Sequence, residues 1–252
     1  MSFVTYEAQG GTGLLTLNRP ARLNAINGDL LADFERCLVQ AMADPDTAAV
    51  VLTGAGRAFC SGDDLAEFSE QSADQQAARA HIGAIQRITK LMLGGGKLII
   101  GAMHGYAVGG GFEWLLNCDM VVASDTLIAF FPEMGWGAFV TGGVTYLLPR
   151  SIGYQRAMEL FVLGERQSAE RLLQLGVVNW VVPQDQMLAK ALCVAEAVGK
   201  KSRTTVARLK VILNKDLAAD LWRAVEIEEA ATIEAFMDPE AAKRVRSFAT
   251  RR

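Results

Sequence analysis

Two glutamates in apolar surroundings are the residues of this sequence best suited to acid–base chemistry. Glu113 follows three glycines in the stretch GYAVGGGFEW, where Phe112 and Trp114 flank it. Glu133 lies in the apolar stretch LIAFFPEMGWG. Apolar neighbours disfavour the charged form of a carboxyl group and raise its pKa toward neutrality, where general acids and bases work best. For each glutamate alone, a paired structural carboxylate or a surface residue remains an open interpretation.

Two glycine-rich loops could supply hydrogen-bond donors beside these carboxyls. One loop lies in VVLTGAGRAFCSGDDL and the other precedes Phe112, each after an apolar run typical of a buried strand. Amides at the start of a helix lack internal partners and face the positive end of its dipole. Together the loops could direct two N–H groups at one oxyanion, and loss of one such donor costs about 3–4 kcal/mol. Each loop alone also fits a tight turn. A dinucleotide fingerprint is disfavoured because Phe59 stands where it needs a third glycine.

The elements that must position these loops alternate between strands and helices. FVTYEAQ and GLLTLNR flank a Gly-Gly-Thr turn and predict a hairpin, and AAVVLTG, KLIIGAM, DMVVAS and VVNWVVP predict buried strands. Amphipathic helices, the first capped by Asn27, are predicted between strands. This order predicts an α/β fold with a largely parallel sheet and right-handed crossovers. Beyond Gln184 the pattern is helical, so we expect an α/β core over 1–190 and a helical C-terminal region over 191–252 that packs against it.

Composition excludes several other classes of protein. Hydrophobic residues make up 51% of the 252 residues and charged residues 21%, which is typical of a globular chain. A net charge of −3 gives no reason to expect nucleic-acid binding, and the basic end, KRVRSFATRR, predicts a solvated terminal turn. Four widely spaced cysteines and two histidines predict reduced thiols and no metal site. Neither a signal peptide nor a membrane span is visible, so we expect a soluble, cytoplasmic protein.

The motifs, taken in order, resemble the crotonase or enoyl-CoA hydratase/isomerase superfamily nearly end to end. The matching stretches are LTLNRPARLNAI, DPDTAAVVLTGAGRAFCSGDDL, GYAVGGGFEWLLNCDMVVAS, FPEMGWG, PRSIGYQRAMEL and SAERLLQLGVVNWVVP. The resemblance implies a spiral of repeated ββα units and a C-terminal trimerisation region, in a homotrimer or dimer of trimers. It also implies an acyl-CoA substrate of fatty acid metabolism and no separate cofactor, since coenzyme A is part of the substrate.

The resemblance also implies which residues form the site. The thioester oxygen would bind in an oxyanion hole formed by the amides of Asp63 and Gly110. Glu113 and Glu133 would be the catalytic pair of an enoyl-CoA hydratase, whose glutamates have the same spacing. Glu133 would act at the α-carbon and Glu113 on water, although the sequence leaves the division of roles open. The CoA and acyl parts would contact Arg22, Asn24, Ala25, Ser61, Asp64, Leu65, Thr141 and Phe248.

Several positions depart from the hydratase pattern. Val140 and Thr141 replace a Pro-Gly pair beside the water and acyl pocket, which counts against hydration. Ala66 replaces a lysine that often contacts the 3′-phosphate, and Lys243 and Arg244, where Glu-Gly is frequent, could replace it from a neighbouring subunit. Asp63 stands where a small residue is common. Its carboxylate would be unfavourable near an oxyanion unless it points away.

Hydration of a 2-enoyl-CoA is the leading interpretation, with other functions kept open. An enoyl-CoA isomerase needs one base, and a thioester hydrolase or a dehalogenase-like enzyme belongs to the same superfamily, although no nucleophilic aspartate stands out for dehalogenation. A non-catalytic acyl-CoA- or RNA-binding protein is the alternative from another class. The two glutamates and the acidic net charge argue against it.

Overall fold

A six-stranded sheet forms the centre of the molecule, as seen in the computed structural model, which describes residues 2–67 and 74–249 except for the side chains of 215–218, 242, 246, 248 and 249. The strand order is β1-β2-β3-β4-β6-β9, and every neighbouring pair except β1–β2 is parallel. These strands are β1 (Val4–Gln9), β2 (Thr12–Leu17), β3 (Ala49–Gly54), β4 (Leu98–Met103), β6 (Met120–Ser124) and β9 (Trp180–Val182). The predicted hairpin and parallel sheet are therefore confirmed.

A second, smaller sheet contains three strands. Its order is β5-β7-β8, formed by β5 (Tyr106–Val108), β7 (Ile128–Phe130) and β8 (Gln167–Ser168). β5 and β7 pair in parallel, and β7 and β8 are antiparallel. Because β5 follows β4 after two residues, the small sheet branches from the large one directly before the triple-glycine loop.

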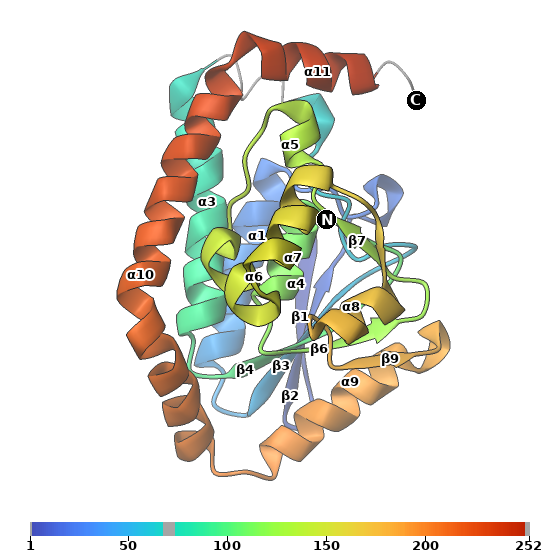
Figure 1. Ribbon diagram of the computed structural model, residues 1–252. Helices are drawn as coiled ribbons and strands as arrows, with labels where there is room; N and C mark the ends of the chain where they lie inside the picture. The colour runs from blue at the N-terminus through green and yellow to red at the C-terminus, as the bar shows by residue number, and fades with distance from the viewer. Residues whose placement is uncertain (1, 68–73, 250–252) are drawn as a thin grey trace.

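Helices cover both faces of the large sheet (Figure 1). They are α1 (Gly28–Ala43), α3 (Gln75–Gly94), α4 (Gly110–Leu116), α5 (Glu133–Trp136), α6 (Val144–Ile152), α7 (Tyr154–Leu163), α8 (Ala169–Leu175), α9 (Gln184–Gly199), α10 (Arg203–Met237) and α11 (Pro239–Ala249), with a 3-10 turn, η1, at Pro20–Arg22. The predicted cap of α1 is confirmed, since Asn27 Oδ1 accepts a hydrogen bond of 3.0 Å from Leu30 N.

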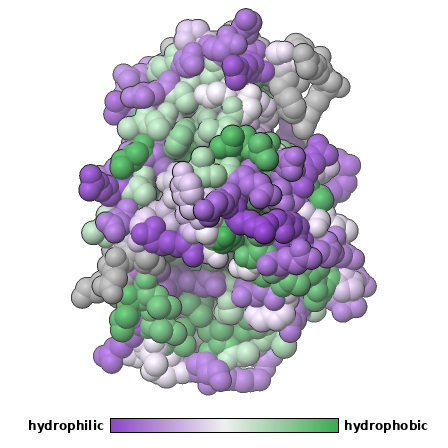
Figure 2. All heavy atoms as spheres, viewed as in Figure 1, coloured by the Kyte–Doolittle hydropathy of each residue, from purple (hydrophilic) through white to green (hydrophobic). Residues whose placement is uncertain are grey.

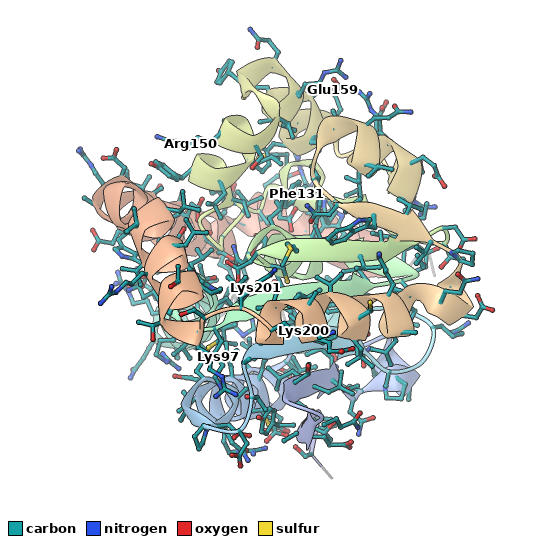
Figure 3. All side chains as sticks on the ribbon, turned by 90° about the horizontal axis from the view of Figure 1, so that it is seen from below. Lys97, Phe131, Arg150, Glu159, Lys200 and Lys201 are labelled. Carbon is teal, nitrogen blue, oxygen red and sulfur yellow. The ribbon has the colours of Figure 1, made fainter. Side chains whose placement is uncertain are left out.

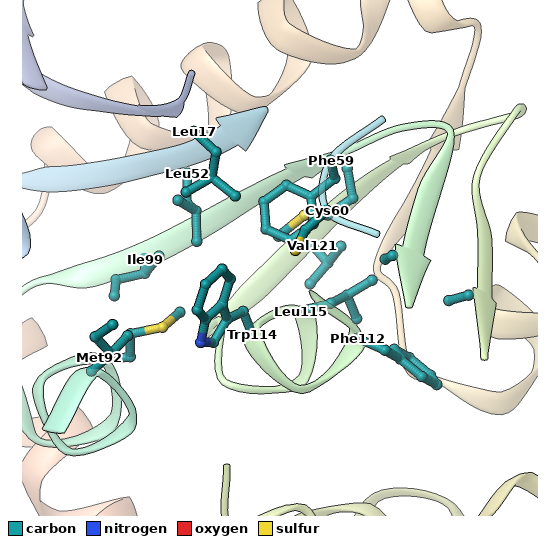
Figure 4. Packing of buried hydrophobic residues seen from close by; sticks show 14 of the residues in the cluster. Leu17, Leu52, Phe59, Cys60, Met92, Ile99, Phe112, Trp114, Leu115 and Val121 are labelled. Atoms are coloured by element: carbon teal, nitrogen blue, oxygen red, sulfur yellow. The ribbon is translucent and has the colours of Figure 1, made fainter. Parts of the chain in front are cut away.

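The main hydrophobic core lies between the sheet and α1, α3 and α4. Phe34 and Trp114 meet there edge to face, with ring centroids 4.8 Å apart, and Figure 4 shows Trp114 beside Met92, with the strand residues Leu52 and Ile99 nearby. α9 covers the opposite face through a row of buried residues, Met187, Ala191 and Ala195, packed on Val51, Ile100 and Val122. Figure 3 shows α9 lying along the sheet with Lys200 and Lys201 near its C-terminal end. Trp114 therefore belongs to the core, although the sequence places it next to Glu113.

The C-terminal helices pack on the core of their own chain. Position 190 falls inside α9, and α10 runs alongside α3 and α6 (Figure 1). A buried lysine ties α10 to the residue before β6, because Lys210 Nζ lies 2.7 Å from Asp119 Oδ2 and 2.7 Å from Met92 O. No described helix is long and apolar enough to cross a membrane.

The predicted solvated turn at the basic C-terminal end is wrong for residues 243–249. These residues belong to α11, which begins at Pro239 and packs beside α5. Ala241 and Val245 are buried, so α11 has an apolar face as well as its basic one. The periodic apolar face stabilises a helix there in spite of the accumulated positive charge.

Candidate active site

The two glycine-rich loops lie side by side at the carboxyl ends of their strands. Cys60 and Ala107 form a parallel bridge, in which Cys60 N donates to Tyr106 O at 2.9 Å and Val108 N donates to Cys60 O at 3.0 Å. A β-carbon at Gly62, where φ is +84°, would lie 2.9 Å from Val108 O, so the close approach requires glycine. The predicted convergence of the two loops is present in the structure.

Two backbone amides, those of Asp63 and Gly110, border one pocket. Ile26 and Asp63 form a parallel bridge, in which Ile26 N donates to Gly62 O and Asp64 N donates to Ile26 O, both at 2.8 Å. Since successive peptide groups of an extended chain alternate in direction, the Asp63 N–H points away from Ile26. Gly110 begins α4, so its N–H has no partner within the helix. A β-carbon at Gly110 would lie 2.7 Å from Ile26 Cδ1.

The pocket between these loops is small and mostly apolar, with a cavity volume of about 40 Å³. α3, α5 and α10 all contribute to its walls. Its lining residues are Ser61, Gly62, Asp63, Leu65, Ile82, Ile85, Val108, Gly109, Gly110, Glu113, Pro132, Glu133, Trp136, Ala138, Phe139, Thr141, Thr232 and Phe236. Both predicted glutamates therefore face the same cavity.

Glu113 is buried and held by one residue, Thr141. Thr141 N donates to Glu113 Oε1 at 2.7 Å, and Thr141 Oγ1 donates to Oε2 at 2.6 Å. Burial raises the pKa of Glu113 to about 7, the hydrogen bonds from Thr141 oppose the shift, and the negative charge of Asp63 adds to it. Near neutral pH this carboxyl group is thus poised to accept or release a proton.

Glu133 has a different environment. Its residue is partly exposed, but the carboxyl Oε2 is shielded from solvent and has no hydrogen-bond partner among the described residues. Burial, and then the charge of Glu113, raise the pKa of Glu133 well above its ordinary value. Gly109 makes room for this carboxyl, because at φ +51° its β-carbon would collide with Glu133 Oε1.

A buried carboxyl group of α10, Glu228, whose pKa burial raises to about 8, holds the loop that carries Thr141. Glu228 Oε2 accepts from Gly143 N at 2.6 Å, and Oε1 accepts from Thr145 N at 2.8 Å and from Thr145 Oγ1 at 2.5 Å. Thr232, one turn further along α10, donates to Val140 O at 3.3 Å. The loop is therefore fixed on both sides of Thr141 by the C-terminal helix.

The Asp63 side chain points toward α3 and contacts a histidine. Its Oδ1 lies 3.1 Å from His81 Nε2, and the side chains of His81 and Asp63 are 4% and 32% exposed. Burial lowers the pKa of His81, but the hydrogen bond and charge of Asp63, with the charge of Glu67, outweigh it and raise the pKa above its ordinary value. The added carboxylate is thus paired with a histidine whose protonated form it favours.

This architecture recurs in known proteins. A family model described as enoyl-CoA hydratase/isomerase matches residues 7–252. The chain belongs to the enoyl-CoA hydratase/isomerase family. The crotonase resemblance and the fold class predicted from the sequence are therefore confirmed.

Individual members of the family support the assignment over most of their length. A probable mitochondrial enoyl-CoA hydratase of Dictyostelium discoideum is 32% identical over 224 residues, 89% of this chain and 79% of that protein. A mevalonyl-coenzyme A hydratase of Aspergillus fumigatus is 35% identical over 223 residues, 87% of this chain and 78% of that protein. The crystal structure of an enoyl-CoA hydratase/isomerase from Mycobacterium paratuberculosis is similar with a TM-score of 0.92 at 28% identity, and the match covers 98% of each chain.

The pocket brings together most of the site residues predicted from the family resemblance. Those that line it are Ser61, Asp63, Leu65, Gly110, Glu113, Glu133 and Thr141. Its described lining does not include Arg22, Asn24, Ala25 or Asp64, which lie in the neighbouring loops. Phe248 lies in α11, and its side chain is outside the described residues.

Two of the predicted CoA-binding side chains are occupied by the protein itself. Asn24 is fully buried, and its Nδ2 donates to Ala55 O at 2.9 Å and to Ala58 O at 2.8 Å. Asp64 forms an ion pair of 2.7 Å with Arg19. Contacts of coenzyme A with Asn24 therefore require backbone atoms, and Arg22 is left as an exposed cation on the same loop.

Sequence reasoning missed Glu228 and His81 as parts of this site. A usable signal existed for each, because both interrupt an apolar helical face. Glu228 follows Val225 by one turn and precedes Thr232 by another, and His81 precedes the buried Ile82 and Ile85. A charged or titratable side chain on the buried stripe of a helix indicates a partner on a neighbouring element.

Proposed function

We propose that this chain hydrates 2-enoyl-CoA thioesters, adding water across the 2,3 double bond. The observation that carries the proposal is the pair of carboxyl groups that face one cavity in different hydrogen-bonding environments. Glu113 accepts two hydrogen bonds from Thr141, which favour its charged form, whereas Glu133 Oε2 has no partner among the described residues. Environments that separate two pKa values in this way divide the roles of base and acid.

The division of labour follows from these proton affinities. Glu113, ionised, removes a proton from water while the water oxygen attacks the β-carbon. Glu133, protonated, donates its proton to the α-carbon, so water has added as hydroxyl and hydrogen. The two carboxyls then exchange protons through solvent before the next turnover. The amides of Asp63 and Gly110 stabilise the enolate oxygen formed between the two steps, with the Gly110 N–H at the start of α4.

Isomerisation of a 3-enoyl-CoA is the second candidate, and one observation favours it. Both oxygens of Glu113 accept hydrogen bonds from Thr141, whereas Glu133 Oε2 has no partner in the part of the chain that the structure describes. A single carboxyl group that moves a proton between two carbons of the substrate suffices for this reaction.

One assay separates the two candidates. The protein is incubated with crotonyl-CoA and longer 2-enoyl-CoA esters, and loss of the conjugated thioester absorbance is followed. Hydration predicts turnover that the variants Glu113→Gln and Glu133→Gln each lose. Turnover of 3-enoyl-CoA that survives Glu113→Gln, without turnover of any 2-enoyl-CoA, would replace hydration by isomerisation.

We further propose that the chain assembles as a homotrimer or dimer of trimers, with 191–252 as the oligomerisation region. Support comes from large apolar side chains exposed on α10, which Figure 2 shows as a hydrophobic patch over the lower part of this helix. The exposed residues at this end of α10 are Leu209, Val211, Ile212 and Leu213. Contiguous apolar surface of this kind marks an interaction site. Sedimentation equilibrium tests the assembly, and a monomer at micromolar concentration would contradict it.

The proposal also includes the cellular compartment of the protein. We assign the chain to acyl-CoA metabolism in a reducing compartment such as the cytoplasm. All four cysteines are unpaired, and Cys193 is exposed. A free exposed thiol is compatible with a reducing environment.

A further inference from the structure

Asp63 creates an electrostatic problem at the proposed oxyanion hole. The enolate oxygen would carry negative charge beside the Asp63 N–H, and covalent geometry keeps the carboxylate of an aspartate within about 3–5 Å of its own amide. Like charges at such a distance repel, and a mostly apolar pocket screens the repulsion poorly. The same charge also raises the pKa of Glu113 and of Glu133, so Asp63 acts on the whole pocket.

His81 is placed to remove this problem. Its ring lies on the face of α3 that lines the pocket, next to Ile82, and is almost fully buried. Its Nε2 is 3.1 Å from Asp63 Oδ1, which turns the carboxylate toward α3. The charged groups acting on His81 in the described part of the chain are Asp63 and Glu67, both negative, and both favour the imidazolium form.

We propose that His81 is a positioning residue that holds the Asp63 carboxylate away from the oxyanion hole and, in its imidazolium form, offsets its charge, so that the backbone amide of Asp63 can stabilise an enolate. This inference rests on the proposed acyl-CoA chemistry. It explains how a chain with aspartate at this position keeps the loop usable for catalysis. The two residues act as a unit. If His81 is removed, Asp63 leaves an uncompensated negative charge beside the oxyanion hole.

A double-mutant cycle tests the pair. His81→Ala is expected to lower kcat about 10-fold, equivalent to about 1.4 kcal/mol of transition-state stabilisation, with a change of less than about 2-fold in the Kd of a saturated acyl-CoA. Adding Asp63→Ala to His81→Ala removes the uncompensated carboxylate and keeps the amide. The double variant is therefore expected to regain most of the 10-fold loss. His81→Gln, which keeps a hydrogen-bond donor without the charge, should lie between wild type and His81→Ala.

The assay must measure formation of the enolate separately from the addition of water. Exchange of the α-hydrogen of butyryl-CoA in D₂O passes through an enolate and needs no hydration, so it is followed by mass spectrometry beside the hydratase assay. Rates are compared on the pH plateau of each variant, because a shifted pKa of Glu113 would otherwise imitate a loss of stabilisation. Circular dichroism and thermal melts verify folding, and His104→Gln, alone and with Asp63→Ala, is the matched control at the other histidine.

The possible results separate the two levels of the argument. Loss of exchange in His81→Ala with recovery in the double variant supports the pair, even where no hydration occurs and the proposed hydratase function fails. A double variant as slow as His81→Ala, or His81→Ala with unchanged exchange, overturns the inference while leaving the hydratase proposal intact. In a further outcome, Asp63→Ala raises the exchange rate by the same factor in the His104→Gln background as in the His81→Ala background. That result would show a general effect of Asp63 and would also refute the pairing. Wild-type protein that catalyses neither hydration nor exchange would overturn both.

Discussion

Thr141 controls the proton affinity of Glu113, and the change Thr141→Val tests this directly. Valine has nearly the shape of threonine and keeps the backbone N–H that binds Glu113 Oε1. It removes the hydroxyl that donates to Oε2 at 2.6 Å. The perturbation therefore deletes one hydrogen bond to a buried carboxylate without emptying space.

The magnitude follows from the strength of that bond. A hydrogen bond to a charged group contributes about 1.5–3 kcal/mol, and about 1.4 kcal/mol corresponds to one pKa unit, so the pKa of Glu113 should rise by about 1–2 units from its value of about 7. A base works only when ionised. At pH 7 the ionised fraction would fall from about one half to between about 10% and 1%, which predicts a 5- to 50-fold loss in kcat/KM.

The assay is the pH profile of kcat/KM for a 2-enoyl-CoA. In wild type, activity should rise with pH through about 7, as Glu113 ionises, and fall at higher pH, as Glu133 loses the proton it must donate. In Thr141→Val the rising limb should move to higher pH, so the deficit shrinks as the pH is raised. Thr141→Ser, which keeps the hydroxyl, is the control and should retain the wild-type limb. A uniform loss of rate with an unshifted limb would refute the reasoning.

Three further changes test other parts of the structure. Gly109→Ala should lower both kcat and the melting temperature, because φ is +51° there and the β-carbon would strike Glu133. Strain of about 1–3 kcal/mol corresponds to a loss of about 2–10 °C in Tm for a chain of this size. A variant with the wild-type Tm in calorimetry and the wild-type kcat would contradict this. Glu228→Gln should reduce kcat several-fold with little change in acyl-CoA Kd, since an amide cannot accept at both former carboxylate oxygens, and unchanged kinetics would show that the loop holds itself. Lys210→Met should cost about 1 kcal/mol in denaturant unfolding, because the partly solvated Asp119 carboxylate loses its cationic partner. Lys210→Met combined with Asp119→Asn should recover part of this loss, and equal losses in the two proteins would count against a charge effect.

The order of strands and the convergence of the glycine loops could be predicted because they depend on local sequence. Apolar runs followed by glycines specify strands that end in open loops, and the parallel pairing of β3 with β4 brings those loops to one edge. Local patterns also placed the start of α4 within the triple glycine. The same locality explains the wrong prediction at the C-terminal end, where charge was weighed more heavily than the apolar spacing of Ala241 and Val245.

The environment of each candidate site residue could not be read in this way, because it depends on contacts between distant segments. Glu228 contacts a loop 85 residues earlier in the chain, and Thr141 meets a glutamate 28 residues earlier. The family resemblance selected Asn24 for coenzyme A, whereas in the structure its side chain supports the loop at Ala55 and Ala58. A side chain's neighbours, and therefore its pKa and availability, are fixed only once the tertiary structure is known.

The departure at Thr141 shows how much this changes the chemical argument. In sequence, threonine after Val140 counts against hydration, since it replaces a smaller residue beside the acyl pocket. In the structure its hydroxyl is used up by Glu113 and opposes the effect of burial on that carboxyl. Without this bond the effect of burial on Glu113 would be less opposed, and Glu113 would be shifted further toward the protonated form that burial also favours for Glu133. Because hydration needs one acid and one base, the residue that counts against the reaction in sequence supports, in the structure, the proposed division of roles between the pair.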